Sequence, residues 1–260
     1  MVSSGSKLTR SGSGRKRAPL QRPIAWYLRQ LSRLMNVLSD DELERLIPLL
    51  SERKLDSREF LFSAGEAPDR VYLLLKGRVK VYQVAENGKE IILDVAEKGD
   101  VVGDMAIVED GERIASAQAL DEAVAASISW EDFSHLLHQS PRLAFAMAEL
   151  MAGRLAGMQR SFMNMASKPV SARIAEALLD RGVDGSIELG LTHQEFAQTL
   201  ATSRETVTAL LSRFVTMGCV APKSSGFMLT DEQLLRDIAN GEVSVSSRHP
   251  VPTPQRAAAT

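Results

Sequence analysis

Short apolar runs recur at intervals of about ten residues between residues 59 and 130, and glycine, asparagine and aspartate separate them. This spacing is typical of short strands. In the clearest run, residues 71–84, Gly77 interrupts the apolar stretch and valines then alternate with Lys80 and Tyr82. Asn87 and Gly88 follow and predict a type I′ hairpin turn, in which both central residues need positive φ. Six or more antiparallel strands of this kind predict a jelly roll or a small barrel.

Segments with the features of helices lie before and after this strand region. Apolar residues recur every three or four positions from 26 to 50, and Ser39 followed by three acidic residues is typical of a capped helix start. After Ser140 and Pro141 no proline occurs before Pro169. One helix of about 26 residues, about 39 Å long, fits this stretch.

Two apolar series run along this long helix, each with members seven residues apart, and they interleave by three and four. A strip of this kind predicts a partner helix. Packing of the strip against the chain's own barrel is the alternative. The two series are Ala148, Leu155 and Phe162, and Met151, Met158 and Met165.

Residues 192–218 contain two capped helical segments joined by a very short turn. Thr192 with Glu195 three positions later is a capping-box pattern, and Ser203 precedes the second segment. This arrangement predicts a helix-turn-helix, whose second helix enters the major groove of DNA with its N-terminal side chains at base edges. An ordinary helical hairpin with a polar surface is the alternative. Residues 220–229, with a proline and a glycine at the bend, predict a two-stranded wing.

The side chains at the start of the second helix have the chemistry of base recognition. They are Arg204, Glu205 and Thr208. Arginine makes paired hydrogen bonds to guanine O6 and N7, and glutamate accepts a hydrogen bond from cytosine N4. The segment therefore predicts sequence-specific DNA binding.

Composition narrows the function classes further. The 260 residues are 44% hydrophobic and 25% charged with a net charge of −2, which excludes a fibrous chain and a polycationic nucleic-acid binder. Cys219 is the only cysteine, so one chain holds no internal disulfide, no thiolate zinc site and no cysteine-ligated iron–sulfur cluster. A reducing, cytoplasmic location fits. No run of about 18 apolar residues occurs, so no membrane span is predicted.

These features divide the chain into five parts. Residues 1–22 carry six basic side chains and no acid, which predicts a disordered basic arm, either simply solvated or touching DNA phosphates through Arg15, Lys16 and Arg17. A strand-rich domain at 23–139, a long helix at 140–168, a DNA-binding domain at 169–240 and a disordered tail at 241–260 follow. The resemblance described next implies that the strand-rich domain is a sensor domain and that the long helix is a dimerisation helix.

This order of elements resembles the cyclic-AMP receptor protein and FNR (Crp-Fnr) family of bacterial transcription regulators over residues 40–240. The segments that carry the resemblance are SRETV at 203–207, VSARIA at 170–175, VYLLLKG at 71–77 and GDVVG at 99–103. The resemblance implies an α+β fold with an N-terminal cyclic-nucleotide-binding-like β jelly roll, a long dimerisation helix and a C-terminal winged helix-turn-helix. It also implies a homodimer through residues 140–166, a palindromic promoter site, and RNA polymerase as a further partner.

The resemblance implies base contacts at Arg204 and Glu205. We add Ser203 and Thr208 as candidate DNA contacts at the start of the same helix, and Arg213 and Lys223 as phosphate contacts. Ala209 stands where the cyclic-AMP receptor protein carries a second base-reading arginine. We therefore expect a related but relaxed half-site.

The family's phosphate-binding turn matches residues 103–106 here, together with Arg113. The departures are that Asp104 is one methylene shorter than the family's glutamate, Ala106 replaces a glycine, and Ile114 removes a hydroxyl. Because each lost polar partner of a buried group costs about 1 to 3 kcal/mol, tight cyclic-AMP binding is not expected. The candidate effector residues are Gly103, Asp104, Met105 and Arg113, with Met158 and Gln159 on the dimer helix. A different small anion, a different nucleotide, or no ligand with control by abundance remain as alternatives.

The sequence lacks the residues that haem binding or a metal-dependent barrel enzyme would need. His135 and His138 follow the strands and His193 lies in the helix-turn-helix, so no haem is expected. A cupin-like barrel enzyme needs histidine and carboxylate metal ligands on its strands, and residues 59–130 contain no histidine. We expect no enzyme and no metal site. A ligand-binding signalling module that acts through protein contacts is the remaining rival.

Overall fold

The computed structural model describes residues 24–107 and 111–246. Three short helices begin it, Ile24–Leu31 (α1), Arg33–Asn36 (α2) and Asp40–Leu46 (α3), with a 3-10 turn at Ile47–Leu49 (η1). As predicted, Ser39 caps α3, and the Glu42 carboxylate accepts a hydrogen bond from the Ser39 backbone N–H at 2.7 Å. The predicted basic arm, 1–22, lies outside the described residues.

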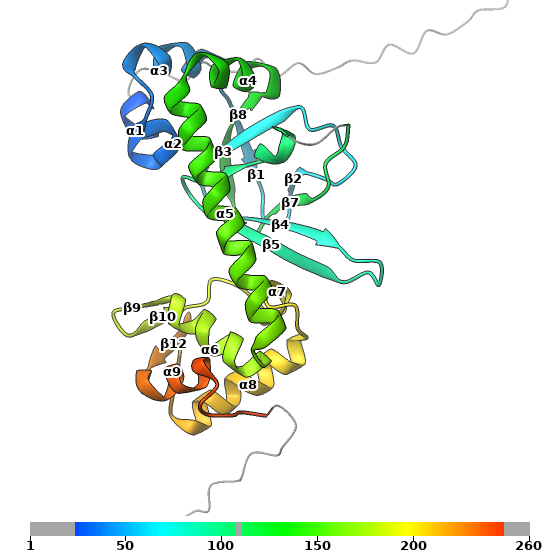
Figure 1. Cartoon of the computed structure of the whole chain (residues 1–260), viewed down its shortest axis with the longest axis vertical. Coiled ribbons are helices and arrows are strands. Elements are labelled where there is room, and N and C mark those ends of the chain that lie inside the picture. Colours follow the sequence, from blue (N-terminus) through cyan, green and yellow to red (C-terminus); the bar gives the residue numbers. More distant parts are fainter. Residues whose placement is uncertain (1–23, 108–110, 247–260) are drawn as a thin grey trace, which may run out of the picture.

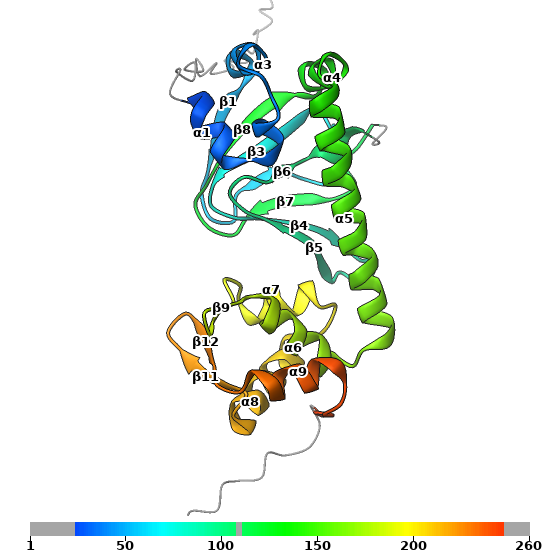
Figure 2. The same cartoon turned by 60° about the vertical axis from the view of Figure 1, so that its left-hand side comes forward.

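Two four-stranded antiparallel sheets form the β sandwich, which confirms the predicted fold class (Figures 1 and 2). Their strand orders are β1-β8-β3-β6 and β2-β7-β4-β5. Side chains of both sheets, among them Leu61, Leu74 and Val79, form a buried core between them. The strands are Ser51–Leu55 (β1), Phe60–Phe62 (β2), Arg70–Lys76 (β3), Val79–Val84 (β4), Glu90–Ala96 (β5), Val101–Val102 (β6), Ser116–Ala119 (β7) and Ala123–Ser129 (β8), with a 3-10 turn at Asp104–Ile107 (η2).

The hairpin between β4 and β5 exists, but its predicted type I′ turn is wrong. Gly88 has a φ of 76°, whereas Asn87 is not among the residues with positive φ. Because Val84 pairs with Glu90, five residues connect the strands, too many for a two-residue turn. The Gly88 N–H instead donates to the Ala85 carbonyl at 2.8 Å.

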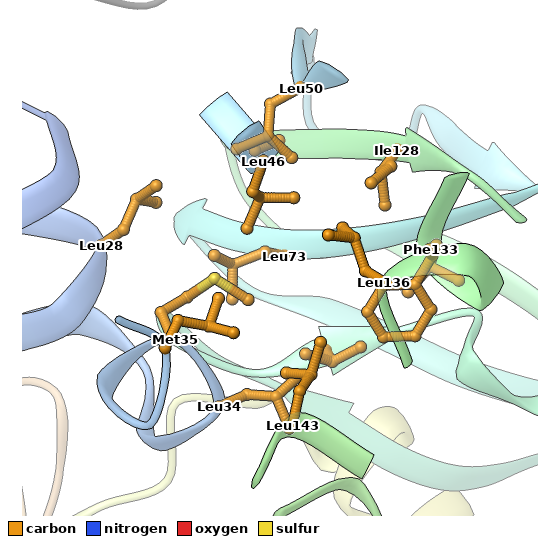
Figure 3. Close-up of a cluster of buried hydrophobic side chains, with 14 of the residues drawn as sticks. Leu28, Leu34, Met35, Leu46, Leu50, Leu73, Ile128, Phe133, Leu136 and Leu143 are labelled. Carbon is orange, nitrogen blue, oxygen red and sulfur yellow. The ribbon is translucent and has the colours of Figure 1, made fainter. Parts of the chain in front are cut away.

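Two helices follow the sandwich, Trp130–Gln139 (α4) and the 27-residue Pro141–Ser167 (α5). They pack with the N-terminal helices on one face of the first sheet, around a second core (Figure 3). This core includes Leu28, Leu34, Met35, Leu73, Ile128, Phe133, Leu136 and Leu143.

Only the first half of α5 is anchored in this way. Leu143 and Met147 are its buried residues, whereas the predicted apolar strip is largely exposed in the single chain. The exposed fractions are 58% for Leu155, 62% for Met158, 67% for Phe162 and 46% for Met165. Packing of the strip against the chain's own barrel is therefore not observed for these four residues.

The C-terminal part of the chain folds around its own core, which includes Ile174, Phe196, Leu211 and Phe214. Burial raises the pKa of the Cys219 thiol, and this cysteine acts there as a small apolar residue. The four strands form one sheet in the order β11-β12-β10-β9. The elements are Val170–Asp180 (α6), Gly182–Val183 (β9), Ser186–Glu188 (β10), His193–Thr199 (α7), Arg204–Met217 (α8), Val220–Lys223 (β11), Gly226–Leu229 (β12) and Glu232–Asn240 (α9).

The predicted tail begins too early. Val243 and Val245 pack against the C-terminal core, so residues 241–246 belong to this domain because they cover apolar surface. Residues 247–260 lie outside the described part.

The connection between α5 and α6 is braced by one carboxylate. Pro169 precedes α6, and Glu176 of that helix accepts hydrogen bonds from Asn164 at 2.9 Å and from Lys168 at 3.0 Å. Glu176 thus ties the end of α5 to the DNA-binding domain across residues 165–170, which we call the hinge because Pro169 prevents one helix from continuing through them. Among the described residues, no helix is long and apolar enough to cross a membrane.

Candidate DNA-binding and effector sites

The helix-turn-helix forms as its capping residues predict. The Thr192 hydroxyl accepts a hydrogen bond from the Glu195 backbone N–H, and the Glu195 carboxylate accepts one from the Thr192 backbone N–H at 2.8 Å. The turn contains Ala201, whose φ is 49°. Ser203 then caps α8 by accepting from the Thr206 N–H at 3.2 Å.

The predicted base-reading residues lie together at the exposed start of α8. Arg204, Glu205 and Thr208 are all exposed, and Arg204 and Thr208 are one helical turn apart. Hydrogen bonds from its own backbone N–H and from the Ser203 side chain lower the pKa of Glu205. Glu205 is therefore an anionic acceptor at neutral pH, the form that accepts from cytosine N4.

Sequence reasoning missed a contact made by His193. Nδ1 of His193, at the start of α7, lies 3.0 Å from Oγ1 of Thr208 on α8. This hydrogen bond joins the two helices of the motif beside the candidate DNA surface. The residues are 15 positions apart, and no local pattern connects them.

The two predicted phosphate contacts lie in different surroundings. Arg213 is half-buried on α8, about 180° around the helix from Arg204. Lys223 is exposed on β11, and its ammonium donates to the Ser186 hydroxyl at 2.9 Å.

The candidate effector site contains a buried guanidinium. Arg113 is 3% exposed, lies 4.0 Å over the Phe62 ring, and donates to the Arg70 carbonyl at 2.6 Å and to the Gly103 carbonyl at 3.4 Å. Gly103 has a φ of 83°, and a Cβ there would lie 3.1 Å from the Arg113 guanidinium. Among the described residues, no carboxylate pairs with Arg113, and its Nε has no hydrogen-bond partner.

Asp104, the next residue after Gly103, is neutralised from α5. Asp104 is 2% exposed and forms an ion pair with Arg154, which also donates to the Val101 carbonyl. Arg154 is a residue of the site that sequence reasoning missed, because an ion pair across 50 positions leaves no local signal. It connects the sensor domain, residues 24–139, to the long helix.

The other predicted effector residues are more exposed. Met105 is 42% exposed, and Met158 and Gln159 are exposed on α5, with Met158 one turn after Arg154. The helix therefore presents Arg154, rather than Met158 or Gln159, to Asp104. Within residues 24–107 and 111–246, no group of three or more histidine, cysteine, aspartate or glutamate side chains is placed to hold a metal ion.

Replacing Arg154 with alanine leaves the Asp104 carboxylate buried without its counter-ion. We expect the free energy of unfolding at neutral pH to fall by about 2 kcal/mol, somewhat less than for a pair in which both members are fully buried. Urea unfolding followed by tryptophan fluorescence measures this, since Trp26 and Trp130 both lie in the sensor domain.

The matched control is the double variant that combines Arg154→Ala with Asp104→Asn. It should recover much of the loss, because the uncompensated charge is gone. If the double variant is no more stable than Arg154→Ala alone, the ion pair is not the cause.

Two families of domains match the chain. The Cyclic nucleotide-binding domain matches residues 52–140, and the Crp-like helix-turn-helix domain matches residues 172–238. The chain is similar to the cAMP-activated global transcriptional regulator CRP of Pasteurella multocida, with 33% identity over 66% of this chain and 86% of the relative. It is also similar to the Cyclic AMP receptor protein of Thermus thermophilus, with 28% identity over 81% of this chain and 98% of the relative.

Solved structures share the fold. A CooA variant from Carboxydothermus hydrogenoformans has a TM-score of 0.68 at 24% identity, covering 82% of this chain and 99% of that one. FixK2 from Bradyrhizobium japonicum has a TM-score of 0.65 at 20% identity, covering 76% and 99%. Together with the sequence relatives, both domain matches in this order show that the chain belongs to the Crp-Fnr family of transcription regulators.

Proposed function

We propose that the protein is a homodimer that reads a palindromic promoter site with two copies of α8, under the control of a small anion bound at Gly103 and Arg113. The observation that carries the DNA-binding part is the exposed, Ser203-capped start of α8 with Arg204, Glu205 and Thr208 on its surface. A two-fold dimer of such helices reads half-sites whose centres are about ten base pairs apart.

The exposed strip of α5 supports the dimer. Exposed apolar residues at seven-residue spacing are the pattern by which two helices pack. Burying side chains of the size of Leu155, Met158 and Phe162 contributes about 1.5 to 3 kcal/mol each. Two copies of α5 packed side by side would bury both apolar strips. The resulting dimer would carry two DNA-binding domains.

The buried guanidinium of Arg113 supports an anionic effector. One relative is named as cAMP-activated and another as a Cyclic AMP receptor protein, but this chain has Ile114, Met158 and Gln159 where the resemblance places hydroxyl contacts to cyclic AMP. We therefore propose an anion other than cyclic AMP.

A regulator of this kind acts by binding promoter DNA, not by catalysis, and RNA polymerase is its expected protein partner. Because bacterial promoter DNA lies in the cytoplasm, we expect the protein there. The rival hypothesis is a module that signals through protein contacts alone. A DNA-binding assay distinguishes the two, because such a module would not bind DNA.

Replacing Arg204 or Glu205 with alanine removes one base-reading side chain from each protomer. We expect each variant to lose about 1 to 3 kcal/mol of discrimination between the selected site and a variant base pair, while non-specific binding stays near wild type. Mobility shift with duplexes selected from a random library measures both quantities. Thr216→Ala, exposed farther along α8, is the control. Unchanged sequence preference in both variants would show that α8 does not read bases through these residues.

Replacing Phe162 with glutamate places a charge in the apolar strip. We expect the dimer dissociation constant to rise by at least about tenfold, because an apolar contact is lost and two like charges face each other. Arg160→Glu, exposed on the opposite side of α5, is the matched control and should leave the dimer intact. Sedimentation velocity over a concentration series measures the difference, and equal behaviour of the two variants argues against this interface.

Cyclic AMP should not stabilise the protein specifically. We expect it to raise the thermal midpoint of the wild type no more than that of Arg113→Lys, since a specific ligand stabilises only the form that binds it. Scanning fluorimetry with a panel of phosphorylated small molecules tests this. The effector is the compound whose shift is lost in Arg113→Lys, and if that compound is cyclic AMP, the proposed exclusion is wrong.

A further inference from the structure

A second arginine faces the interior of the sandwich, Arg70 at the start of β3. Successive residues of a strand point to opposite faces of the sheet. Tyr72 and Leu74, two and four positions after Arg70, belong to the core between the two sheets. Arg70 therefore lies on the face of β3 that is turned toward the second sheet. Arg113 enters the same interior, where it lies over the ring of Phe62 on β2.

Two buried serine hydroxyls hold the Arg70 guanidinium. Its Nε and Nη2 donate to the Ser127 hydroxyl at 3.3 Å and 3.1 Å, and Nη2 also donates to the Ser51 hydroxyl at 3.0 Å. Ser51 is 6% exposed and Ser127 is 4% exposed. Nη1 of Arg70 has no hydrogen-bond partner among the described residues, and it is not one of the unpartnered atoms that are buried. One edge of the guanidinium is therefore fixed, whereas Nη1 is open.

Ser127 is a polar residue on a strand face that is otherwise apolar. Ala123 and Ala125 precede it on the same face of β8 and belong to the core between the sheets. A buried hydroxyl lowers stability unless it is hydrogen-bonded, and alanine at this position would avoid that cost. The serine pair instead keeps Arg70 extended from β3 across β8 toward β1. The sequence thus places an ordered cation inside the domain.

The two arginines leave the interior of the sensor domain positively charged. Neither Arg70 nor Arg113 forms an ion pair with a carboxylate among the described residues. The buried Asp104 is already paired with Arg154 and balances neither of them. Nη2 of Arg113 donates to the Arg70 carbonyl at 2.6 Å, so the two residues are held together. Like charges in an interior of low dielectric repel each other, and a ligand with two anionic groups would offset both.

We propose that the effector of this protein carries two anionic groups, one bound by Arg113 with Gly103 and the other by Arg70 through its open Nη1. Ser51 and Ser127 are positioning residues for Arg70. The inference rests on the proposed anionic effector and names its chemical class, a small molecule with two carboxylate or phosphate groups on a short spacer. Guanidinium groups bind both kinds of oxyanion through charge-assisted hydrogen bonds.

The test compares probes that carry one and two anionic groups, with the full-length protein. The pairs are inorganic phosphate with inorganic pyrophosphate, and butyrate with the linear dicarboxylates from malonate to adipate. We expect one two-anion probe to bind the wild type at least about tenfold more tightly than its one-anion counterpart, because it gains a charge-assisted hydrogen bond. Isothermal titration calorimetry measures the dissociation constants. The pair that shows the preference distinguishes a phosphate effector from a carboxylate effector.

Variants assign each anionic group to its arginine. Arg70→Gln should bind the two-anion probe about tenfold more weakly and the one-anion probe as the wild type does, whereas Arg113→Lys should weaken both. Ser127→Ala keeps the charge, removes a group that orients it, and should reduce the two-anion preference about threefold. It tests the same contact if Arg70→Gln does not fold. Arg33→Gln, which removes an exposed cation from α2, is the matched control and should bind both probes as the wild type does.

The inference is overturned if the wild type shows no preference for a two-anion probe, or if Arg70→Gln, or Ser127→Ala in its place, keeps the full preference. Equal weakening of both probes by Arg70→Gln also overturns it, because Arg70 would then only support the fold around Arg113. Failure of the proposed anionic effector is a different result, in which no probe of either kind binds the wild type more tightly than it binds Arg113→Lys.

Discussion

The single, uninterrupted helix α5 is the constraint on which the other parts of this molecule depend. Its first half is anchored in the sensor core by Leu143 and Met147. Arg154, in its middle, forms an ion pair with the buried Asp104. Its second half exposes the apolar strip, and its end is held by the hydrogen bonds that Glu176 accepts from Asn164 and Lys168. Because a helix transmits rotation and translation along its axis as one body, the effector site, the proposed dimer contact and the hinge cannot move independently.

The distribution of charge is as informative as its near-zero sum. A chain with a net charge of −2 is expected to bind DNA through a few placed cations rather than through bulk attraction. Arg204 is positioned by the cap at Ser203, and Lys223 by the wing. Arg78 and Lys80 are equally basic in the sequence, but each forms an ion pair with a carboxylate of the sandwich. A count of basic residues therefore does not separate cations held in ion pairs from cations that could contact DNA, whereas the pairing of each cation does.

Most of the fold follows from local signals in the sequence, and the exceptions have physical causes. The capping residues Ser39, Thr192 and Ser203 predict their helices correctly because a cap is a contact within three residues. Strand β1 escapes prediction because two of its three more buried positions hold the polar residues Ser51 and Arg53, so its sequence, SERKL, does not alternate between apolar and polar residues. The pairing of Asp104 with Arg154 and of His193 with Thr208 depends on tertiary packing alone, so the candidate sites were predictable in their position along the chain but not in these partners.

An effector controls DNA binding only through a difference in its affinity for two arrangements of the protein, and each 1.4 kcal/mol of difference shifts the equilibrium tenfold. An anion that reaches Arg113 also approaches the buried carboxylate of Asp104, which follows Gly103 directly. Repulsion between the two is lowest when Arg154 lies between them. The anion therefore favours arrangements that hold Arg154 in the site, and Arg154 lies about 21 Å along the helix axis from Lys168. In this protein the counter-ion of Asp104 is supplied by α5, the helix that ends at the connection to the DNA-binding domain, so the anionic effector that we propose would act on the orientation of α8 through the position of one guanidinium.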